Sequence, residues 1–325
     1  MMRARDSGRQ LSPAIAGSVG KQTHDPGAGA PGFMLPSASR TRIVMVGITM
    51  RNHWQVVGES VRGAVHERNG LPNQDAIYWL PASGEGSSIV LAVADGHGSA
   101  RYSRSHIGAS LAVESAAQLV QDFINRDFEN LSLLKDAVED WLPRAVVRKW
   151  VELVTDHFSA DPLNEESIVA YGATLIVVAV SERFALYLQL GDGEILTVSE
   201  SGEVTRPLTR DERLIANETT SLCAPDAWRD FRVSFQPFNH SSPALILLST
   251  DGYPNSFRYE SGFFKVGSDI LHMIREHGLA MVKDNLAGWL SDSTRAGSGD
   301  DVTLGILCSV AKPEIIVGPG QYRER

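Results

Sequence analysis

The sequence predicts an α+β domain built in layers, with β-sheets in the middle and helices outside. Three observations indicate this class. Short apolar strands separated by turn residues occupy much of the chain, a pair of helical segments interrupts them, and a second helical pair precedes a final strand. Strands that bracket paired helices are typical of layered α+β domains.

The first half of the chain contains strands followed by helices. Strands are predicted at residues 54–66, 76–80 and 87–94. A helix is predicted over residues 107–123, because Ile107, Leu111, Leu119 and Phe123 recur at multiples of four and form one apolar stripe. A second helical stretch covers residues 131–158, and we expect Pro143 to break or kink it.

The second half begins and ends with strands. Apolar runs joined by short turns predict strands at residues 172–180, 184–191, 194–200, 231–238 and 243–250. Two helical stretches follow at about 267–277 and 279–290, and residues 302–310 close the domain as a strand. This order completes the layered pattern.

The ends of the chain differ in composition from its middle. Residues 1–42 are rich in Gly, Pro, Ser and Ala, show no periodicity and are weakly basic, so we expect a disordered arm. Residues 312–325 are expected to form a flexible tail. The folded domain is then predicted to span residues 50–311.

Composition excludes several classes of protein. The net charge of −9 and the isoelectric point near 5.5 argue against nucleic acid as a partner, because phosphate binding needs a basic face. The only two cysteines, Cys223 and Cys308, do not form a CxxC pair, which argues against a zinc ribbon or a disulfide framework and fits a reducing compartment. No apolar run approaches the ~18 residues of a membrane span. We therefore expect a cytoplasmic protein without a membrane partner.

Aspartates recur where predicted strands begin or end. Asp75 precedes a strand, Asp95 and Asp251 end strands, Asp192 lies in a Gly-Asp-Gly turn, and Asp300 and Asp301 precede the last strand. Antiparallel neighbours place the end of one strand beside the start of the next. These carboxylates can therefore meet at one end of the sheets.

Such a group of acids predicts a metal site. Clustered carboxylates repel one another, and divalent cations remove that repulsion. An oxygen-only donor set favours hard ions such as Mg²⁺ or Mn²⁺. Each aspartate alone has a simpler interpretation as a turn or capping residue, and Asp-Gly is a common turn signal.

Six short motifs, in order, resemble the metal-dependent Ser/Thr phosphatases of the protein phosphatase 2C type (the PPM family), in particular its compact bacterial branch. The motifs are NQDA, VADGHG, GATL, LGDGE, LLSTDGY and GDDVTL, within residues 54–308. The resemblance implies a central β-sandwich of two antiparallel sheets flanked by paired antiparallel helices, an αββα arrangement. It also implies two Mn²⁺ or Mg²⁺ ions.

The resemblance assigns roles to individual residues. Asp95 would bridge the two ions, with the Gly96 carbonyl as a further ligand. Asp251 and Asp300 would bind one ion, and Asp75 would reach the other directly or through water. Asp192 would hold a third, weaker ion. His97 resembles the general acid, which together with Asp95 makes up the expected catalytic pair. Thr174 and Thr303 match positions interpreted as structural.

Three departures from the family pattern bear on function. Gly193 and Glu194 stand where the family has Ser-Arg, and Ser99 replaces a glycine. Gly70 stands where many members carry a phosphate-binding arginine. Arg68, His66 and Arg62 are the nearby candidates for that role, and an altered hairpin would have to bring one of them into place. Arg68 is slightly favoured because guanidinium can hold a phosphoryl group with two hydrogen bonds, and a solvated surface charge is the alternative.

The resemblance implies hydrolysis of phosphoserine and phosphothreonine on proteins by a metal-activated water. A phosphorylated protein, and a cognate Ser/Thr kinase, would be the partners. Two alternatives stay open: an inactive phosphatase-fold module that regulates by binding, and a phosphoesterase acting on small molecules or nucleotides.

Overall fold

The computed structural model describes residues 42–43, 46–126, 130–160, 167–211, 219–239, 241–317 and 321–322. The chain divides into two compact units. One comprises residues 46–317, and the other comprises residues 1–45 and 318–325. In the smaller unit, β1 (Arg42–Ile43) pairs antiparallel with β13 (Gln321–Tyr322). Almost all of the arm predicted at residues 1–42 lies outside the described residues.

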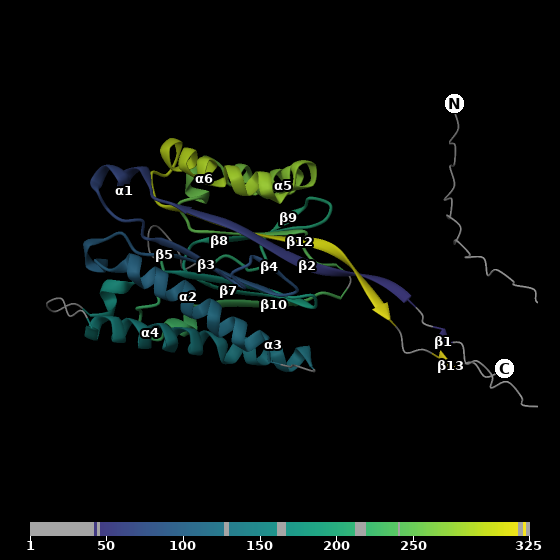
Figure 1. Cartoon of the computed structure of the whole chain (residues 1–325). Helices are drawn as coiled ribbons and strands as arrows, with labels where there is room; N and C mark the ends of the chain where they lie inside the picture. Colours follow the sequence, from purple (N-terminus) through teal and green to yellow (C-terminus); the bar gives the residue numbers. More distant parts are fainter. Residues whose placement is uncertain are drawn as a thin grey trace, which may run out of the picture. The chain divides into compact units, whose positions relative to one another are not determined.

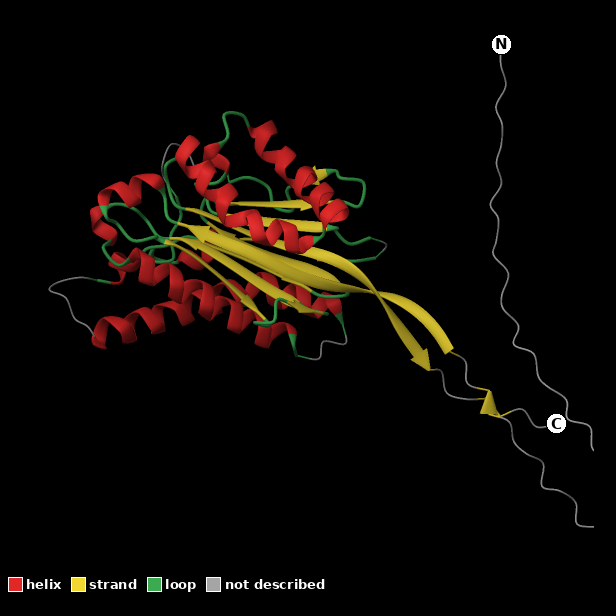
Figure 2. Cartoon of the chain, turned by 45° about the horizontal axis from the view of Figure 1, so that its top comes forward, coloured by secondary structure: helices red, strands yellow, loops and turns green. Residues whose placement is uncertain are grey.

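Residues 46–317 form four layers, in which two sheets lie between two layers of helices (Figure 1). Every strand pairing in both sheets is antiparallel. The predicted αββα class is confirmed. Figure 2 shows the same strands and helices from a second direction.

The first sheet has five strands. In sheet order these are β10 (Arg232–Pro237), β7 (Phe184–Leu190), β6 (Leu175–Val180), β5 (Ile89–Asp95) and β3 (Asp75–Leu80). The strands β5, β6 and β7 are apolar almost throughout because both of their faces are covered, one by helices and one by the other sheet.

The second sheet has six strands. In sheet order these are β4 (Glu85–Gly86), β2 (Val46–Val61), β12 (Val302–Val317), β11 (Leu245–Ser249), β8 (Glu194–Val198) and β9 (Val204–Thr205). The two longest strands, β2 and β12, pair along their whole length, from Val61 opposite Val302 to Val46 opposite Val317.

Helices cover the outer faces of the sheets. On the five-stranded sheet lie α2 (Ser105–Ile124), α3 (Leu131–Asp140) and α4 (Leu142–Ala160), and on the six-stranded sheet lie α5 (Glu260–His277) and α6 (Leu279–Ala296). The short helix α1 (Ala64–Asn69) follows β2. Four 3₁₀ turns complete the described elements: η1 (Ala100–Tyr102), η2 (Ile168–Tyr171), η3 (Ala227–Asp230) and η4 (Pro254–Ser256).

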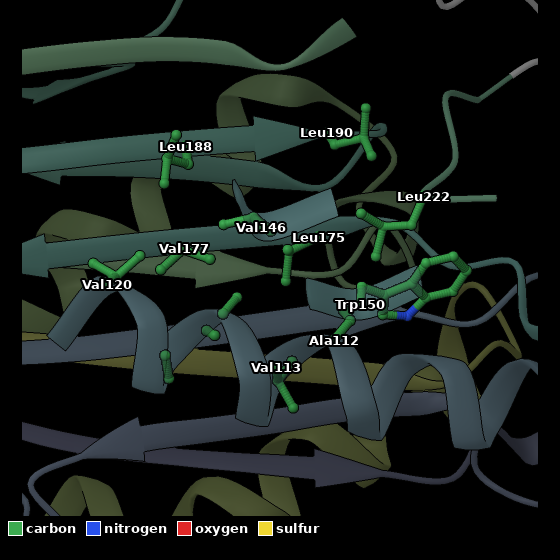
Figure 3. Close-up of a cluster of buried hydrophobic side chains, with 14 of the residues drawn as sticks. Ala112, Val113, Val120, Val146, Trp150, Leu175, Val177, Leu188, Leu190 and Leu222 are labelled. Carbon is green, nitrogen blue, oxygen red and sulfur yellow. The ribbon is translucent and has the colours of Figure 1, made fainter. Parts of the chain in front are cut away.

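Three apolar cores hold the layers together. One lies between the five-stranded sheet and its helices, and its members include Trp150 of α4, Val113 of α2, and Leu175 and Val177 of β6 (Figure 3). A second lies between the six-stranded sheet and α5 and α6. The third separates the two sheets and includes Trp54, Leu91 and Tyr187.

Several element boundaries differ from those predicted. The strand predicted at 54–66 ends at Val61, and residues 64–69 form a helix instead of a hairpin. The break in the helical stretch falls at Trp141, so Pro143 lies in the first turn of α4, where its missing N–H costs no helical hydrogen bond. The strand β12 continues to Val317, past residue 311. Among the described residues, no helix is long and apolar enough to cross a membrane.

Candidate metal centre

A cavity of about 660 Å³ lies where the ends of the two sheets meet, and acidic side chains line it. Four carboxylates and two imidazoles border it: Asp95, Asp192, Asp251, Asp300, His66 and His97. These residues come from both sheets and from the turns that leave them. The structure therefore brings together acids that are up to 205 residues apart in sequence, as their positions at strand ends predicted.

Asp75 and Asp95 lie opposite each other on neighbouring strands. Asp75 is the first residue of β3, Asp95 is the last residue of β5, and the two are register partners. Because strand pairing sets this position, the backbone holds the two carboxylates close together despite the repulsion between their charges.

Hydroxyl groups position the first of these acids. Asp75 is buried, and its Oδ2 accepts hydrogen bonds from Thr250 Oγ1 at 2.6 Å and Thr303 Oγ1 at 2.8 Å. Both threonines come from the six-stranded sheet side, so these bonds cross the sandwich. On the neighbouring strand, the backbone N–H of Asp95 donates to Thr174 Oγ1 at 3.0 Å.

The acids repel one another and are poorly solvated. Burial raises the pKa of Asp95 well above its ordinary value, and the negative charges of Asp75, Asp251, Asp300 and Asp192 raise it further. Burial likewise raises the pKa of Asp75, against the opposing effect of its two threonine hydrogen bonds. The pKa of Asp251 is raised to about 6, by burial first and then by Asp192 and Asp300.

Two further acids each accept a side-chain hydrogen bond. Asp251 Oδ2 accepts from Asn255 Nδ2 at 3.1 Å, one turn further along the chain. Asp192 Oδ1 accepts from Thr219 Oγ1 at 3.0 Å. Gly191, which precedes Asp192, has a φ of 101°, a conformation that glycine adopts readily, and this allows the tight turn between β7 and β8.

The donor set suits a hard divalent cation. Its acids are buried carboxylates that lie close to one another. Their raised pKa values reflect the free energy needed to ionise them there, which a bound cation would lower. Within the described part of the chain, no three His, Cys, Asp or Glu side chains already stand in a ready-made coordination shell.

His97 lies at the edge of the cavity, two residues after Asp95. Its backbone N–H donates to the Gly172 carbonyl at 3.1 Å, and its ring packs edge-on against Tyr102 with centroids 4.7 Å apart. Burial lowers the pKa of His97, and the charge of Asp192 partly opposes that shift. The ring is therefore positioned beside the acids by packing on η1 and η2.

The residues suggested for phosphate binding occupy different places. His66 borders the cavity, whereas Arg68 is exposed on α1 and lies outside the cavity lining. Arg62 is also exposed, and its Nη1 donates to the Leu71 carbonyl at 3.4 Å. Of the described residues that line the cavity, none is Arg or Lys. Among the residues that the structure describes, His66 is therefore the suggested phosphate-binding residue that reaches the cavity lining.

Glu194, which stands in place of the family's arginine, has a partner of its own. Its carboxylate accepts two hydrogen bonds from Arg206, at 2.7 and 2.9 Å, and one from Arg210 at 3.0 Å. The Glu194 carboxylate thus forms ion pairs with Arg206 and Arg210, two residues after the cavity residue Asp192.

Sequence reasoning did not assign roles to several residues that support the site. Thr250 precedes Asp251 directly, and a hydroxyl beside a strand-end acid could have indicated its contact with Asp75. From the sequence, Asp301 is only one of two acids that precede the last strand. It is 3% exposed and accepts hydrogen bonds from the backbone of Gly63 and Gln74 at 2.6 Å each. Those contacts depend on a turn that the sequence did not reveal.

The fold and this acidic cavity define a two-sheet, four-layer domain with a candidate divalent-metal centre at one end. The model of the protein phosphatase 2C family matches residues 62–291, more than two thirds of the chain. The chain belongs to the protein phosphatase 2C family.

Solved structures agree with this fold. The catalytic domain of the serine/threonine protein phosphatase PstP, in complex with two manganese ions, has a TM-score of 0.50 at 18% identity, covering 80% of this chain and 99% of that one. PppA of Pseudomonas aeruginosa has a TM-score of 0.51 at 19% identity, and the match covers 81% of this chain and 100% of that one. The S. agalactiae serine/threonine phosphatase has a TM-score of 0.52 at 17% identity, and the match covers 78% of this chain and 99% of that one. No curated protein sequence matches the chain. At these identities the similarity establishes the fold.

Proposed function

We propose that this chain is a metal-dependent phosphatase that hydrolyses phosphoserine and phosphothreonine on proteins. The observation that carries the proposal is the convergence of Asp95 from one sheet with Asp251 and Asp300 from the other at one cavity, with the buried Asp75 directly opposite Asp95 on the neighbouring strand. Their raised pKa values mean that divalent cations would relieve an existing strain between charges.

The chain's own side chains would divide the work. When bound, two Mn²⁺ or Mg²⁺ ions supply an activated water and positive charge for the phosphoryl oxygens. Asp95 would hold both ions, with the Gly96 carbonyl as a further ligand. Asp251 and Asp300 would hold one of them, Asp75 would reach the other directly or through water, and Asp192 would hold a third, weaker ion. Asp75 would be held in place by Thr250 and Thr303.

His97 would donate a proton to the departing serine or threonine oxygen. Its ring borders the cavity that contains the acids, and Tyr102 and the Gly172 backbone fix its position. General acids must lie within reach of the leaving atom, and the position of His97 in the lining of the same cavity as the acids supports that role.

The cavity also limits how the substrate is held. Because no Arg or Lys lines it, its described side chains offer a phosphoryl dianion mostly negative charge. Binding of phosphate would then depend on the metal ions, with His66 better placed than Arg68 to contact the phosphoryl end. A phosphorylated protein, and the Ser/Thr kinase that produces it, are the partners that this activity requires.

The test is turnover of a phosphothreonine peptide by the metal-free protein with and without added Mn²⁺ or Mg²⁺. We expect activity only with metal, near-complete loss in Asp95→Asn, and normal activity in Asp284→Asn, an exposed acid on α6. Full activity after metal removal would contradict the proposal. A nucleotide panel hydrolysed in preference to phosphopeptides would instead establish the small-molecule alternative, and metal binding without turnover would establish the inactive module.

A further inference from the structure

His66 has one ring nitrogen occupied and the other facing the candidate metal centre. Its side chain is 13% exposed, and Nδ1 lies 2.9 Å from Asp301 Oδ2. Nε2 lies 3.9 Å from Asp300 Oδ1, and the ring borders the cavity. The two neighbouring aspartates thus contact opposite edges of one imidazole.

Asp301 determines which nitrogen carries the proton. Its Oδ1 accepts from the Gly63 backbone and its Oδ2 from the Gln74 backbone, both at 2.6 Å, so the carboxylate acts as an acceptor throughout. His66 Nδ1 must therefore donate to Asp301. In the neutral ring this leaves Nε2 with a lone pair directed into the cavity beside Asp300.

A lone pair beside a carboxylate oxygen is an unfavourable contact unless positive charge lies between them. Two donor atoms that share one ion are separated by at most about twice a metal–ligand distance of ~2.1 Å, or roughly 4.2 Å. The 3.9 Å between Nε2 and Asp300 Oδ1 falls within that limit.

We propose that His66 Nε2 is a nitrogen ligand of the divalent cation held by Asp300, and that Asp301 orients the ring for this purpose. The inference rests on the proposed metal centre and goes beyond its oxygen-only donor set. A carboxylate that accepts from the far nitrogen of a metal-bound histidine is a common arrangement in metal sites, because it fixes the tautomer and raises ligand basicity.

A nitrogen ligand changes which ion the centre prefers. Imidazole suits transition metals, whereas Mg²⁺ is held mainly by carboxylate, carbonyl and water oxygens. The centre should therefore bind Mn²⁺ more tightly than Mg²⁺, and part of that preference should depend on His66.

The direct test is electron spin echo envelope modulation of Mn²⁺ bound to the full chain without substrate. We expect ¹⁴N modulation in the wild type that disappears in His66→Ala and persists in His97→Ala, the matched control at the same cavity. Calorimetry should show His66→Gln binding Mn²⁺ at least ~10-fold more weakly, with a smaller change for Mg²⁺. Asp301→Asn should weaken Mn²⁺ binding about 10–100-fold, as expected for loss of an orienting partner.

The outcomes separate this inference from the proposed function. Mn²⁺ that binds without ¹⁴N modulation, or with modulation that survives in His66→Ala, would overturn the role of His66 and leave the metal centre in place. In that case a direct contact between His66 and the phosphoryl group is favoured. A chain that binds no Mn²⁺ would overturn both. Thermal melting of each metal-free variant identifies any variant that fails to fold, and His66→Gln, the smaller change, then replaces His66→Ala.

Discussion

The hydrogen bonds to Asp75 show how single residues maintain a strained site. A buried carboxylate is costly, and two threonine hydroxyls from the opposite side of the sandwich offset part of that cost. Asp251 accepts an amide hydrogen bond from Asn255 and has a side-chain hydrogen bond with Asp95, yet burial and the charges of Asp192 and Asp300 still raise its pKa to about 6. It is therefore the acid at which relief of repulsion should be measurable.

Asp251→Asn should stabilise the metal-free protein at alkaline pH. The pKa of Asp251 is raised from 3.8 to about 6 in the folded protein. The folded state thus holds this proton to higher pH than the unfolded state, and stability is lost as pH rises from about 4 to 6. In EDTA at pH 8 we expect the variant to be more stable by on the order of 1–2 kcal/mol.

Thermal or urea unfolding from pH 4 to pH 8 measures this effect. The difference between the variant and the wild type should vanish near pH 4, and added Mn²⁺ at pH 8 should stabilise the wild type more than the variant. A variant that is less stable than the wild type in EDTA at pH 8 would show that repulsion at Asp251 is not significant.

His97→Ala should affect substrates according to their leaving groups. A serine alkoxide leaves poorly without a proton, whereas p-nitrophenolate is stable without one. We expect phosphopeptide turnover to fall within the ~10²–10⁴-fold range of general acid catalysis and p-nitrophenyl phosphate turnover to fall much less. The measurement is kcat for both substrates at saturating Mn²⁺. Equal losses would indicate that His97 serves only to shape the turn.

At the residue scale, the sequence indicated which acids meet but not how they are supported. Strand-end positions were enough to indicate that Asp95, Asp192, Asp251 and Asp300 lie at one cavity and that Asp75 lies beside Asp95. The His66–Asp301 contact joins residues 235 positions apart and depends on a helix that begins at Ala64. No local pattern encodes such a contact, and Arg68 was slightly favoured over His66 only because guanidinium can hold a phosphoryl group with two hydrogen bonds. The metal and phosphate roles of these residues remain predictions.

At the scale of elements, the closest approach is that of α2 to the η2 turn. A Cβ on Gly108 would lie 1.8 Å from the Tyr171 carbonyl oxygen, and Trp150 Nε1 donates to the Gly108 carbonyl at 3.0 Å. The absence of a side chain at Gly108 therefore lets the helix, α4 and the turn that supports His97 pack together.

Gly108→Ala should destabilise the protein by at least about 2–3 kcal/mol, because backbone must move to accept the methyl group. Gly288→Ala on α6 is the matched control. Nothing lies within 4 Å of a Cβ there, and alanine should stabilise that helix by about 0.5–1 kcal/mol. Urea unfolding of both variants measures the contrast. Equal effects would mean that α2 can shift without cost.

Element types were predicted well where periodicity is strong and poorly where it is not. The apolar stripe of α2 and the continuous apolar runs of β5, β6 and β7 are unambiguous because burial dictates every position. Residues 62–66 were extended into a strand because α1 has no buried residue and hence no apolar stripe. Likewise, α5 begins at Glu260, seven residues before the predicted start.

At the scale of the whole molecule, residues 46–317 contain both sheets and every candidate site residue. We expect a chain of only these residues to melt within about 2–3 °C of the full chain, a shift that corresponds to less than about 1 kcal/mol. It should also keep metal-dependent turnover. Calorimetric melting and p-nitrophenyl phosphate assays on both chains measure this, and a large fall in either would show that the smaller unit contributes to folding or catalysis.

The core between the two sheets has a consequence for the chemistry. Asp75 and Asp95 belong to one sheet, Asp251 and Asp300 flank strands of the other, and side chains such as Leu91, Ile176 and Leu248 fill the space between. The thickness of that packing fixes the gap that a pair of ions must bridge. Close-packed interiors transmit a change of even one methylene. If the proposed metal centre forms, substitutions in this core, far from any ligand, should therefore change its metal affinity, and its ion preference should depend partly on the hydrophobic interior.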